Sequence, residues 1–291
     1  MAPDTWLQGL TPRLGVAIVW AVATVTMAWW SLHAPSQAMD WRGHVEDLRR
    51  RLLISVVAVG TVSVALFSFG WPKDSAWPRP AIHDNIAGQA FHRIAADLVP
   101  AGVELVVVRP IDGFLAEVTI AIGLAVLLTS PLLVAQVGGF VLPALQERER
   151  RALRNAVLPV ALLFIAGAAF AYAYVMPFLL KTLYGYGTAL GATPLLQVSE
   201  LITMTVGLMA IMGLAFQTPV VMVVATRIGL VDAKTWRHGW RHATVAILIL
   251  SALVTDPTIV SQLMVAGPLL ALYAAGAIMA GFTTVSRSSP A

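Results

Sequence analysis

Residues 118–175 read VTIAIGLAVLLTSPLLVAQVGGFVLPALQERERRALRNAVLPVALLFIAGAAFAYAYV. Two apolar runs, 118–137 and 156–175, frame a short charged segment. That segment holds four arginines, Arg148, Arg150, Arg151 and Arg154. Each run has the roughly 20 residues that an α-helix needs to cross about 30 Å of hydrocarbon. The pattern predicts a helical hairpin in a membrane, with its basic turn in water.

The composition extends this interpretation to the rest of the chain. Hydrophobic residues make up 58% of the 291 residues and charged residues 12%, with a mean hydropathy of +0.79, whereas soluble domains are only about 45–50% apolar. Five further apolar runs lie at 14–32, 52–69, 201–224, 243–255 and 259–281. The run at 243–255 reaches only about 20 Å as a helix. It is too short for an average bilayer, so we expect it to pack against other helices.

The basic residues predict the orientation of the spans. Short loops rich in lysine and arginine stay in the cytoplasm, and three such segments lie before 52–69, after 118–137 and after 201–224. The loop at 70–113 is too long for this rule to apply, and we place it outside. Six helices from residue 52 onward then have both ends inside.

The run at 14–32 does not fit this plan, because the basic segment at 42–51 must stay inside. Three interpretations are open: a cleaved signal peptide, which would carry that segment to the wrong side, an additional helix, and a start codon assigned too early, ahead of Met39. We favour the additional helix because the run is long. The expected organisation is an N-terminal extension at 1–38 with one transmembrane helix, a six-helix membrane domain at 39–285 and a cytoplasmic tail at 286–291.

Several classes of function are excluded by what the sequence lacks. It has no cysteine, and its six histidines have no metal-binding spacing. The net charge of +4 comes from short basic loops, which indicates orientation and not nucleic-acid binding. The spans lack paired acids, histidine clusters and serine motifs, so we expect no enzyme activity, cofactor or metal. A small-solute transporter remains a rival, although an internal repeat and midplane charges typical of that class are not evident.

Two charged strings suggest a family. HVEDLRRRLL (44–53) belongs to an expected amphipathic helix at 40–52 that lies at the cytoplasmic interface. PALQERERRALR (143–154) forms the turn between the runs 118–137 and 156–175. With GLAFQTPVVMVV (213–224) and VTDPTIVSQ (254–262), they resemble, in order and spacing, the TatC family of twin-arginine translocase receptor subunits. The resemblance covers about residues 40–282. It leaves residues 1–38 without a counterpart.

The resemblance implies an all-α polytopic membrane bundle, with a six-helix TatC-like core plus the extra N-terminal helix. It implies a receptor for the twin-arginine signal peptides of folded proteins, in the cytoplasmic membrane of a bacterium or archaeon. Single-span TatA/TatB-type subunits and further copies of the chain are the implied partners. Transport would be driven by the proton-motive force. A paralogue of the family with altered partners or substrates is the alternative.

The resemblance also assigns roles at the cytoplasmic face. Glu149 matches the acid that contacts the arginine pair of the signal peptide, and Asp47 stands where the family usually has glutamate. A guanidinium is best held by carboxylates, and two adjacent arginines need more than one acceptor. Arg49 is expected to order this site, and Phe140 to support the binding surface. The simpler explanations are solvated charge pairs in this loop and interfacial packing of Phe140.

Three further polar positions invite comparison with the family. Gln217 replaces a usual glutamate within a span and is the expected contact for partner subunits, unless it only satisfies a bond within the bundle. Asp256 precedes Pro257, and Thr258 takes the position of a usual acid, so Asp256 either substitutes for that acid or caps the last helix. Asp112 and Glu117 are explained by a solvated outer interface.

Overall fold

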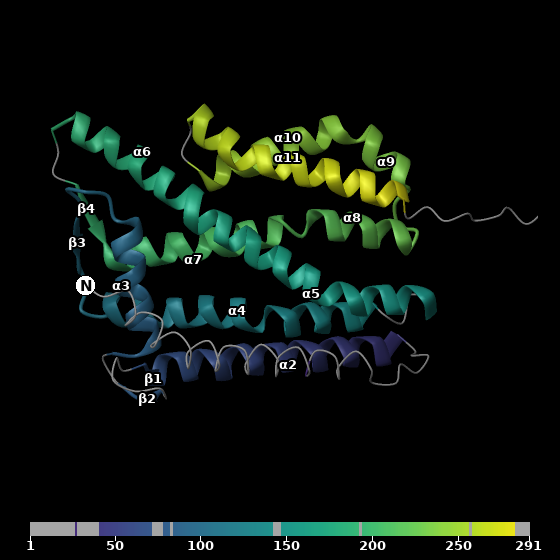
Figure 1. Ribbon diagram of the computed structural model, residues 1–291, viewed down its shortest axis with the longest axis horizontal. Coiled ribbons are helices and arrows are strands. Elements are labelled where there is room, and N and C mark those ends of the chain that lie inside the picture. Colours follow the sequence, from purple (N-terminus) through teal and green to yellow (C-terminus); the bar gives the residue numbers. More distant parts are fainter. Residues whose placement is uncertain are drawn as a thin grey trace, which may run out of the picture. The chain divides into compact units, whose positions relative to one another are not determined.

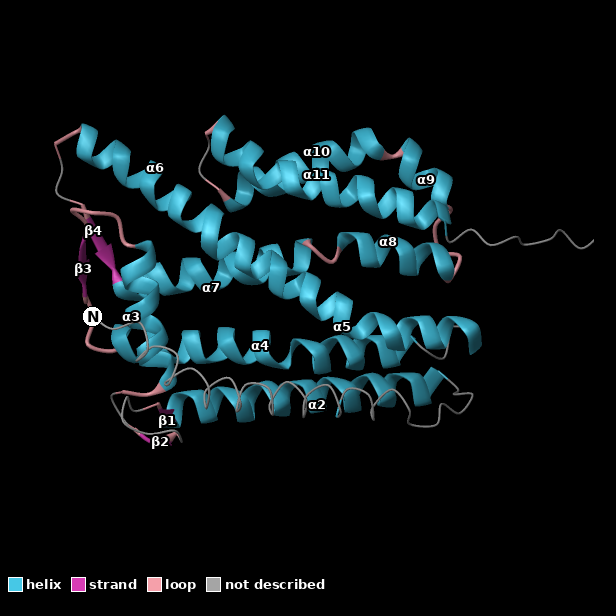
Figure 2. Cartoon of the chain, in the orientation of Figure 1, coloured by secondary structure: helices cyan, strands magenta, loops and turns pink. Residues whose placement is uncertain are grey.

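The structure is a computed structural model that describes residues 27, 41–71, 78–81, 84–141, 147–191, 194–255 and 258–282. Figures 1 and 2 show that these residues are mostly helical. The chain divides into two compact units. The first comprises residues 1–97, 105–161 and 197–206, and the second comprises 98–104, 162–196 and 207–291.

The helices follow the apolar runs of the sequence. Their bounds are α2 Trp41–Ser68, α3 Ile86–Leu98, α4 Asp112–Val141, α5 Glu147–Phe170, α6 Met176–Ala189, α7 Val198–Ala215, α8 Thr218–Arg227, α9 Ala233–His238, α10 Trp240–Val254 and α11 Ile259–Phe282. A π-helical segment, Ala171–Val175, joins α5 to α6. The short strands are β1 Phe69–Gly70, β2 Arg79–Pro80, β3 Glu104–Val106 and β4 Leu195–Gln197.

The described helices confirm the predicted membrane bundle. Five are long and apolar enough to cross a bilayer: Gly43–Ser68, Asp112–Phe140, Ala156–Ala189, Val198–Arg227 and Ile259–Phe282. A sixth apolar helix, α10, has 15 residues, which is about 22 Å. The short span was therefore predicted correctly from its length. The run at 14–32 lies outside the described residues, apart from Met27, and its helix stays a prediction, as do the three proposed domains.

The amphipathic segment at 40–52 is not a helix of its own. It forms the first turns of α2, which runs without a break from Trp41 to Ser68. No proline lies within that stretch, and the first glycine after Gly43 is Gly60. Because nothing in the sequence ends the helix at residue 52, the charged turns continue directly into the apolar span.

Two spans are interrupted near prolines. The π-helical turn at 171–175 comes just before Pro177. Two residues separate α7 from α8, whose first turn contains Pro219. Proline has no N–H to donate and its ring clashes with the preceding turn, so helices adjust or break beside it. The second break leaves Gln217 between two helices.

Helices of the second unit approach closely at glycines. A β-carbon on Gly167 would collide with the Met212 carbonyl and the Phe216 ring, and one on Gly276 would collide with Pro219 and Met222. Close packing at small residues is a main source of helix association in lipid. The short helix α10 is also joined to α11 by a hydrogen bond, in which Gln262 Nε2 donates to the Leu248 carbonyl at 3.0 Å.

The long loop at 70–113 contains its own structure. β1 and β2 form a two-stranded antiparallel pair, and α3 follows. Asn85, which is fully buried, begins α3 by accepting a hydrogen bond from the Gly88 N–H at 2.7 Å, and its side chain also donates to Glu117 Oε2 at 2.9 Å. This second bond ties α3 to the first turns of α4.

Candidate functional site

One face of α2 presents three polar side chains to the end of α4. His44, Asp47 and Arg51 are spaced by three and four residues, so they lie above one another on the same side of the helix. That side packs against α4 near Gly139 and Phe140. Figure 1 shows that the start of α2, the end of α4 and the start of α5 lie at the same end of the first unit.

Asp47 and Arg51 form a largely buried ion pair. Arg51 Nε donates to Asp47 Oδ2 at 2.7 Å, and the two side chains are only 12% (Asp47) and 17% (Arg51) exposed. The Arg51 guanidinium lies against the backbone of Gly139, where a β-carbon would leave it no room. The pair is therefore held by contact with α4 as well as by charge.

An aromatic contact closes the same junction. The rings of His44 and Phe140 stack with centroids 4.2 Å apart and planes inclined by 26°. Offset stacking of this kind stabilises a contact beyond the area that it buries. Phe140, expected to support the binding surface, is thus fixed by α2.

Arg49 points elsewhere. It follows His44 by five residues, which turns its side chain about 140° around a helix with 3.6 residues per turn. Its side chain is 72% exposed and pairs with Glu46, with 4.0 Å between nitrogen and oxygen. In this structure it is Arg51, and not Arg49, that pairs with Asp47.

Glu149 lies in the first turn of α5, directly after residues 142–146. The structure describes its backbone, and its side chain lies outside the described part. The start of α5 nevertheless lies at the same end of the first unit as the start of α2 and the end of α4 (Figure 1). No group of three or more histidine, aspartate or glutamate side chains suited to a metal ion occurs among the described residues.

Comparison with known proteins identifies the group to which this arrangement belongs. The family described as Sec-independent protein translocase protein (TatC) matches residues 43–268, which is most of the chain. The chain belongs to the TatC family. The family resemblance predicted from the charged strings is therefore confirmed.

Individual members of the TatC family agree along most of the chain. The Sec-independent protein translocase protein TatC of Cenarchaeum symbiosum is 36% identical over 249 residues, which cover 83% of this chain and 94% of that protein. The protein of the same name from Synechocystis sp. is 33% identical over 235 residues, covering 80% and 84%. A crystal structure of the twin-arginine translocase receptor TatC superimposes with a TM-score of 0.67 at 29% identity, covering 83% of this chain and all of that one. The chain is accordingly a multi-pass membrane component of a protein translocase.

Two of the polar positions compared with the family in the sequence, Gln217 and Thr258, lie in the second unit. Gln217 sits at the break between α7 and α8, and its Nε2 donates to the Gly213 carbonyl at 3.4 Å. Thr258 precedes α11 and accepts a hydrogen bond from the Ser261 N–H at 3.4 Å, as a residue that begins a helix does. Asp256, the other candidate for that role, lies outside the described residues.

The expectation that a solvated interface explains Asp112 is wrong. Its side chain is fully buried. The carboxylate accepts hydrogen bonds from the Arg109 N–H at 2.9 Å, from Arg109 Nε at 3.0 Å and from Gln197 Nε2 at 2.7 Å. A carboxylate can be buried only with such hydrogen-bond partners. Through them Asp112 ties the strand-to-helix turn before α7 to the start of α4.

Sequence reasoning gave no role to two residues of the α2–α4 junction. The sequence predicts for His44 only that it binds no metal. Its spacing to Asp47, however, places both residues on one face of a helix. Gly139 was passed over, although a Gly-Gly pair within an apolar span often marks a close approach between helices. Those two signals would have located the junction.

Proposed function

We propose that this chain is the twin-arginine signal-peptide receptor and core subunit of its translocase. The observation that supports the proposal is the junction of α2 with α4. There the buried Asp47–Arg51 pair and the His44–Phe140 stack lie at the end of the unit from which the helix of Glu149 starts. An aromatic side chain held in place at the end from which the helix of Glu149 starts suits a peptide that carries two arginines followed by an apolar stretch.

The roles of the two carboxylates differ. Asp47 is only 12% exposed and already accepts a bond from Arg51, so little of it is open to a peptide. We assign Glu149 as the main acceptor for the arginine pair and Asp47 as its support, acting through Arg51. A carboxylate has about four acceptor positions, so Asp47 can still receive one further donor at the site.

The remaining residues complete the site. Phe140, held by His44, backs the peptide, and the exposed Arg49 orders the segment that carries Glu149 when the peptide arrives. Because arginine forms bidentate bonds with carboxylates and lysine does not, the site should distinguish the two. The three basic segments of the sequence orient this end toward the cytoplasm of a bacterial or archaeal cell.

Partner subunits would assemble on the second unit. Gln217 at the α7–α8 break is a polar group within a span, and neutral hydrogen bonds from such a group join helices in lipid. We propose single-span TatA/TatB-type subunits as its partners, with further copies of this chain in the complex. The proton-motive force would drive transport.

Peptide binding tests the receptor. Purified protein should bind a synthetic twin-arginine signal peptide, and should bind the same peptide with two lysines much more weakly. Glu149→Gln should weaken binding of the arginine peptide about tenfold or more, because it removes a charge-assisted bond. Glu46→Gln, which removes an acid that is 73% exposed on α2, is the matched control and should bind normally. Equal binding of both peptides, or normal binding by Glu149→Gln, would reject the proposal.

Partner assembly has a separate test. Gln217→Leu should reduce co-purification of a single-span subunit and leave peptide binding unchanged. Gln262→Leu is the matched control, because Gln262 is also an amide in a span, and its bond to the Leu248 carbonyl joins two helices of this chain, α10 and α11, whereas Gln217 bonds to Gly213, four residues before it. If both variants retained the partner equally, Gln217 would have no part in assembly.

A further inference from the structure

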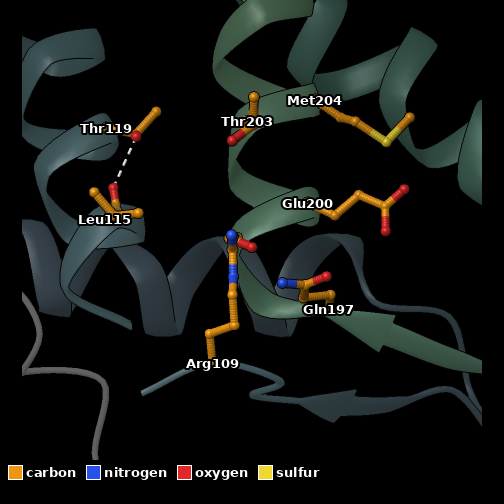
Figure 3. A pocket seen from close by; sticks show the side chains of 8 residues that line it. Arg109, Leu115, Thr119, Gln197, Glu200, Thr203 and Met204 are labelled. Atoms are coloured by element: carbon orange, nitrogen blue, oxygen red, sulfur yellow. Dashed lines mark hydrogen bonds between the residues drawn. The ribbon is translucent and has the colours of Figure 1, made fainter. Parts of the chain in front are cut away.

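A hollow of about 490 Å³ lies at the other end of the first unit from the α2–α4 junction. Its walls come from the segment before α4, the first turns of α4 and the first turns of α7. Figure 3 shows Leu115 and Thr119 on one side and Thr203 and Met204 on another, with the Arg109 side chain rising between them. The volume is that of a site for a small molecule or a lipid headgroup.

The base of this hollow is held in place by buried bonds. Asp112 is fully buried and fixes both Arg109 and Gln197, and each of these two lines the hollow. The Arg109 side chain stays 63% exposed despite this bond. Its guanidinium has five N–H donors, so donors remain for a ligand. The cation is thus positioned before anything binds.

The charges of the hollow do not cancel. Asp112 compensates Arg109, whereas Glu200, in the first turn of α7, has no ion pair with any described residue. Arg109 pairs with Asp112 and not with Glu200, and in Figure 3 the charged ends of Arg109 and Glu200 point in different directions. A ligand that carries a cation and an anion a few ångströms apart could pair its cation with Glu200 and its anion with Arg109.

The hollow also borders an apolar surface at the start of α4. Leu115 in its wall is 41% exposed. Ile111, directly before α4, and Phe114 and Ile122 in its first turns are 52%, 54% and 47% exposed. These residues belong to or adjoin a helix long and apolar enough to span the bilayer. Exposed apolar side chains at the end of a span face lipid, so a bound lipid could keep its acyl chains there.

We propose that this hollow binds the headgroup of an ethanolamine phospholipid. The primary ammonium donates to Glu200, and the phosphate accepts from Arg109 and from the hydroxyl of Thr203. The glycerol backbone and the first carbons of the chains contact Leu115 and Met204. The ligand comes from the bilayer, because a free, water-soluble headgroup has no acyl chains to contact the apolar wall.

Two other common headgroups fit less well. A glycerol headgroup has no cation, so the lipid would bring only negative charge to a hollow that already has Glu200 in excess. A choline headgroup cannot donate hydrogen bonds, and proteins usually hold quaternary ammonium ions with aromatic rings. None of the residues that line the hollow is aromatic.

Lipid competition tests the proposal. Purified protein in detergent is given equal amounts of phosphatidylethanolamine, phosphatidylcholine and phosphatidylglycerol, and the bound lipids are counted by native mass spectrometry. The wild type should prefer ethanolamine, and Glu200→Gln should reduce that preference about tenfold, as expected for a charge-assisted bond. Glu104→Gln, which removes an exposed acid outside the hollow, should keep it.

Two further arms make the outcome decisive. Glu200→Lys should reverse the preference toward phosphatidylglycerol, which an effect on folding alone would not do. Water-soluble glycerophosphoethanolamine should fail to displace the lipid, and displacement at equal concentration would reject the bilayer as the source. An unchanged preference in Glu200→Gln would overturn the proposal.

Discussion

The guanidinium of Arg51 on α2 lies in the space that a β-carbon on Gly139 of α4 would fill. The same guanidinium donates to Asp47 at 2.7 Å. The Asp47–Arg51 pair can therefore occupy its observed position only because residue 139 is a glycine. A residue without a side chain thereby determines where a carboxylate of the proposed binding site lies.

We predict that Gly139→Ala weakens peptide binding. The new methyl group would displace the Arg51 guanidinium and loosen its bond to Asp47. Loss of one charge-assisted hydrogen bond should lower the affinity for the twin-arginine peptide by about tenfold, or about 1.4 kcal/mol. Fluorescence anisotropy with a labelled peptide would measure this change.

The control for that variant is Gly60→Ala, also in a span. A β-carbon on Gly60 would meet nothing within 4 Å, so the substitution should leave the affinity for the peptide as it is. Weak binding by both variants would mean that the loss reflects helix properties in general and not the position of Arg51.

We predict that His44 stabilises the junction through its ring. His44→Ala removes the stack on Phe140 and should cost about 0.5–1.5 kcal/mol of stability, whereas His44→Phe keeps a ring in place and should cost less. Thermal unfolding in detergent, followed by circular dichroism, would rank the three proteins. An equal loss in both variants would show that a polar interaction of His44 matters more than stacking.

The spans could be predicted from the sequence because each consecutive apolar residue adds to the evidence for a membrane helix. A run such as 118–137 is long and uniformly apolar, and hardly any soluble structure explains it. The short helix α10 was predicted from the same kind of count, since residues 243–255 are too few for a full span. The bounds of α2 were less predictable, because its charged turns and its apolar turns form one helix with two different environments.

The contacts between helices were predicted less well. The pairing of Asp47 with Arg51 depends on which face of α2 meets α4, and only the packed structure determines that. Asp112 was misjudged because an acid at the end of a span is usually solvated, and its partner Gln197 is 85 residues away in the chain. Long-range bonds of this kind leave no periodic pattern in the sequence.

We predict that Asp112 is a structural residue. Asp112→Ala would leave the Gln197 amide and the Arg109 guanidinium without their common acceptor, so the thermal midpoint should fall by several degrees. Glu104→Gln, at an exposed acid, should leave the midpoint unchanged. Circular dichroism in detergent would compare the two, and a midpoint for Asp112→Ala equal to that of the control would contradict the structural role.

Gly276, in the second unit, should be more sensitive to an added side chain than Gly139 is in the first. A β-carbon there would come within 2.8 Å of the Pro219 α-carbon, and the backbone cannot move aside as a flexible side chain would. Gly276→Ala should therefore cost about 1–3 kcal/mol through overpacking of α11 on α8. Gly267→Ala, on the same helix with open space around it, should instead be neutral or stabilising by up to about 1 kcal/mol. Thermal unfolding of both variants would check the contact between α8 and α11, and equal midpoints would show that the two helices do not pack at Gly276.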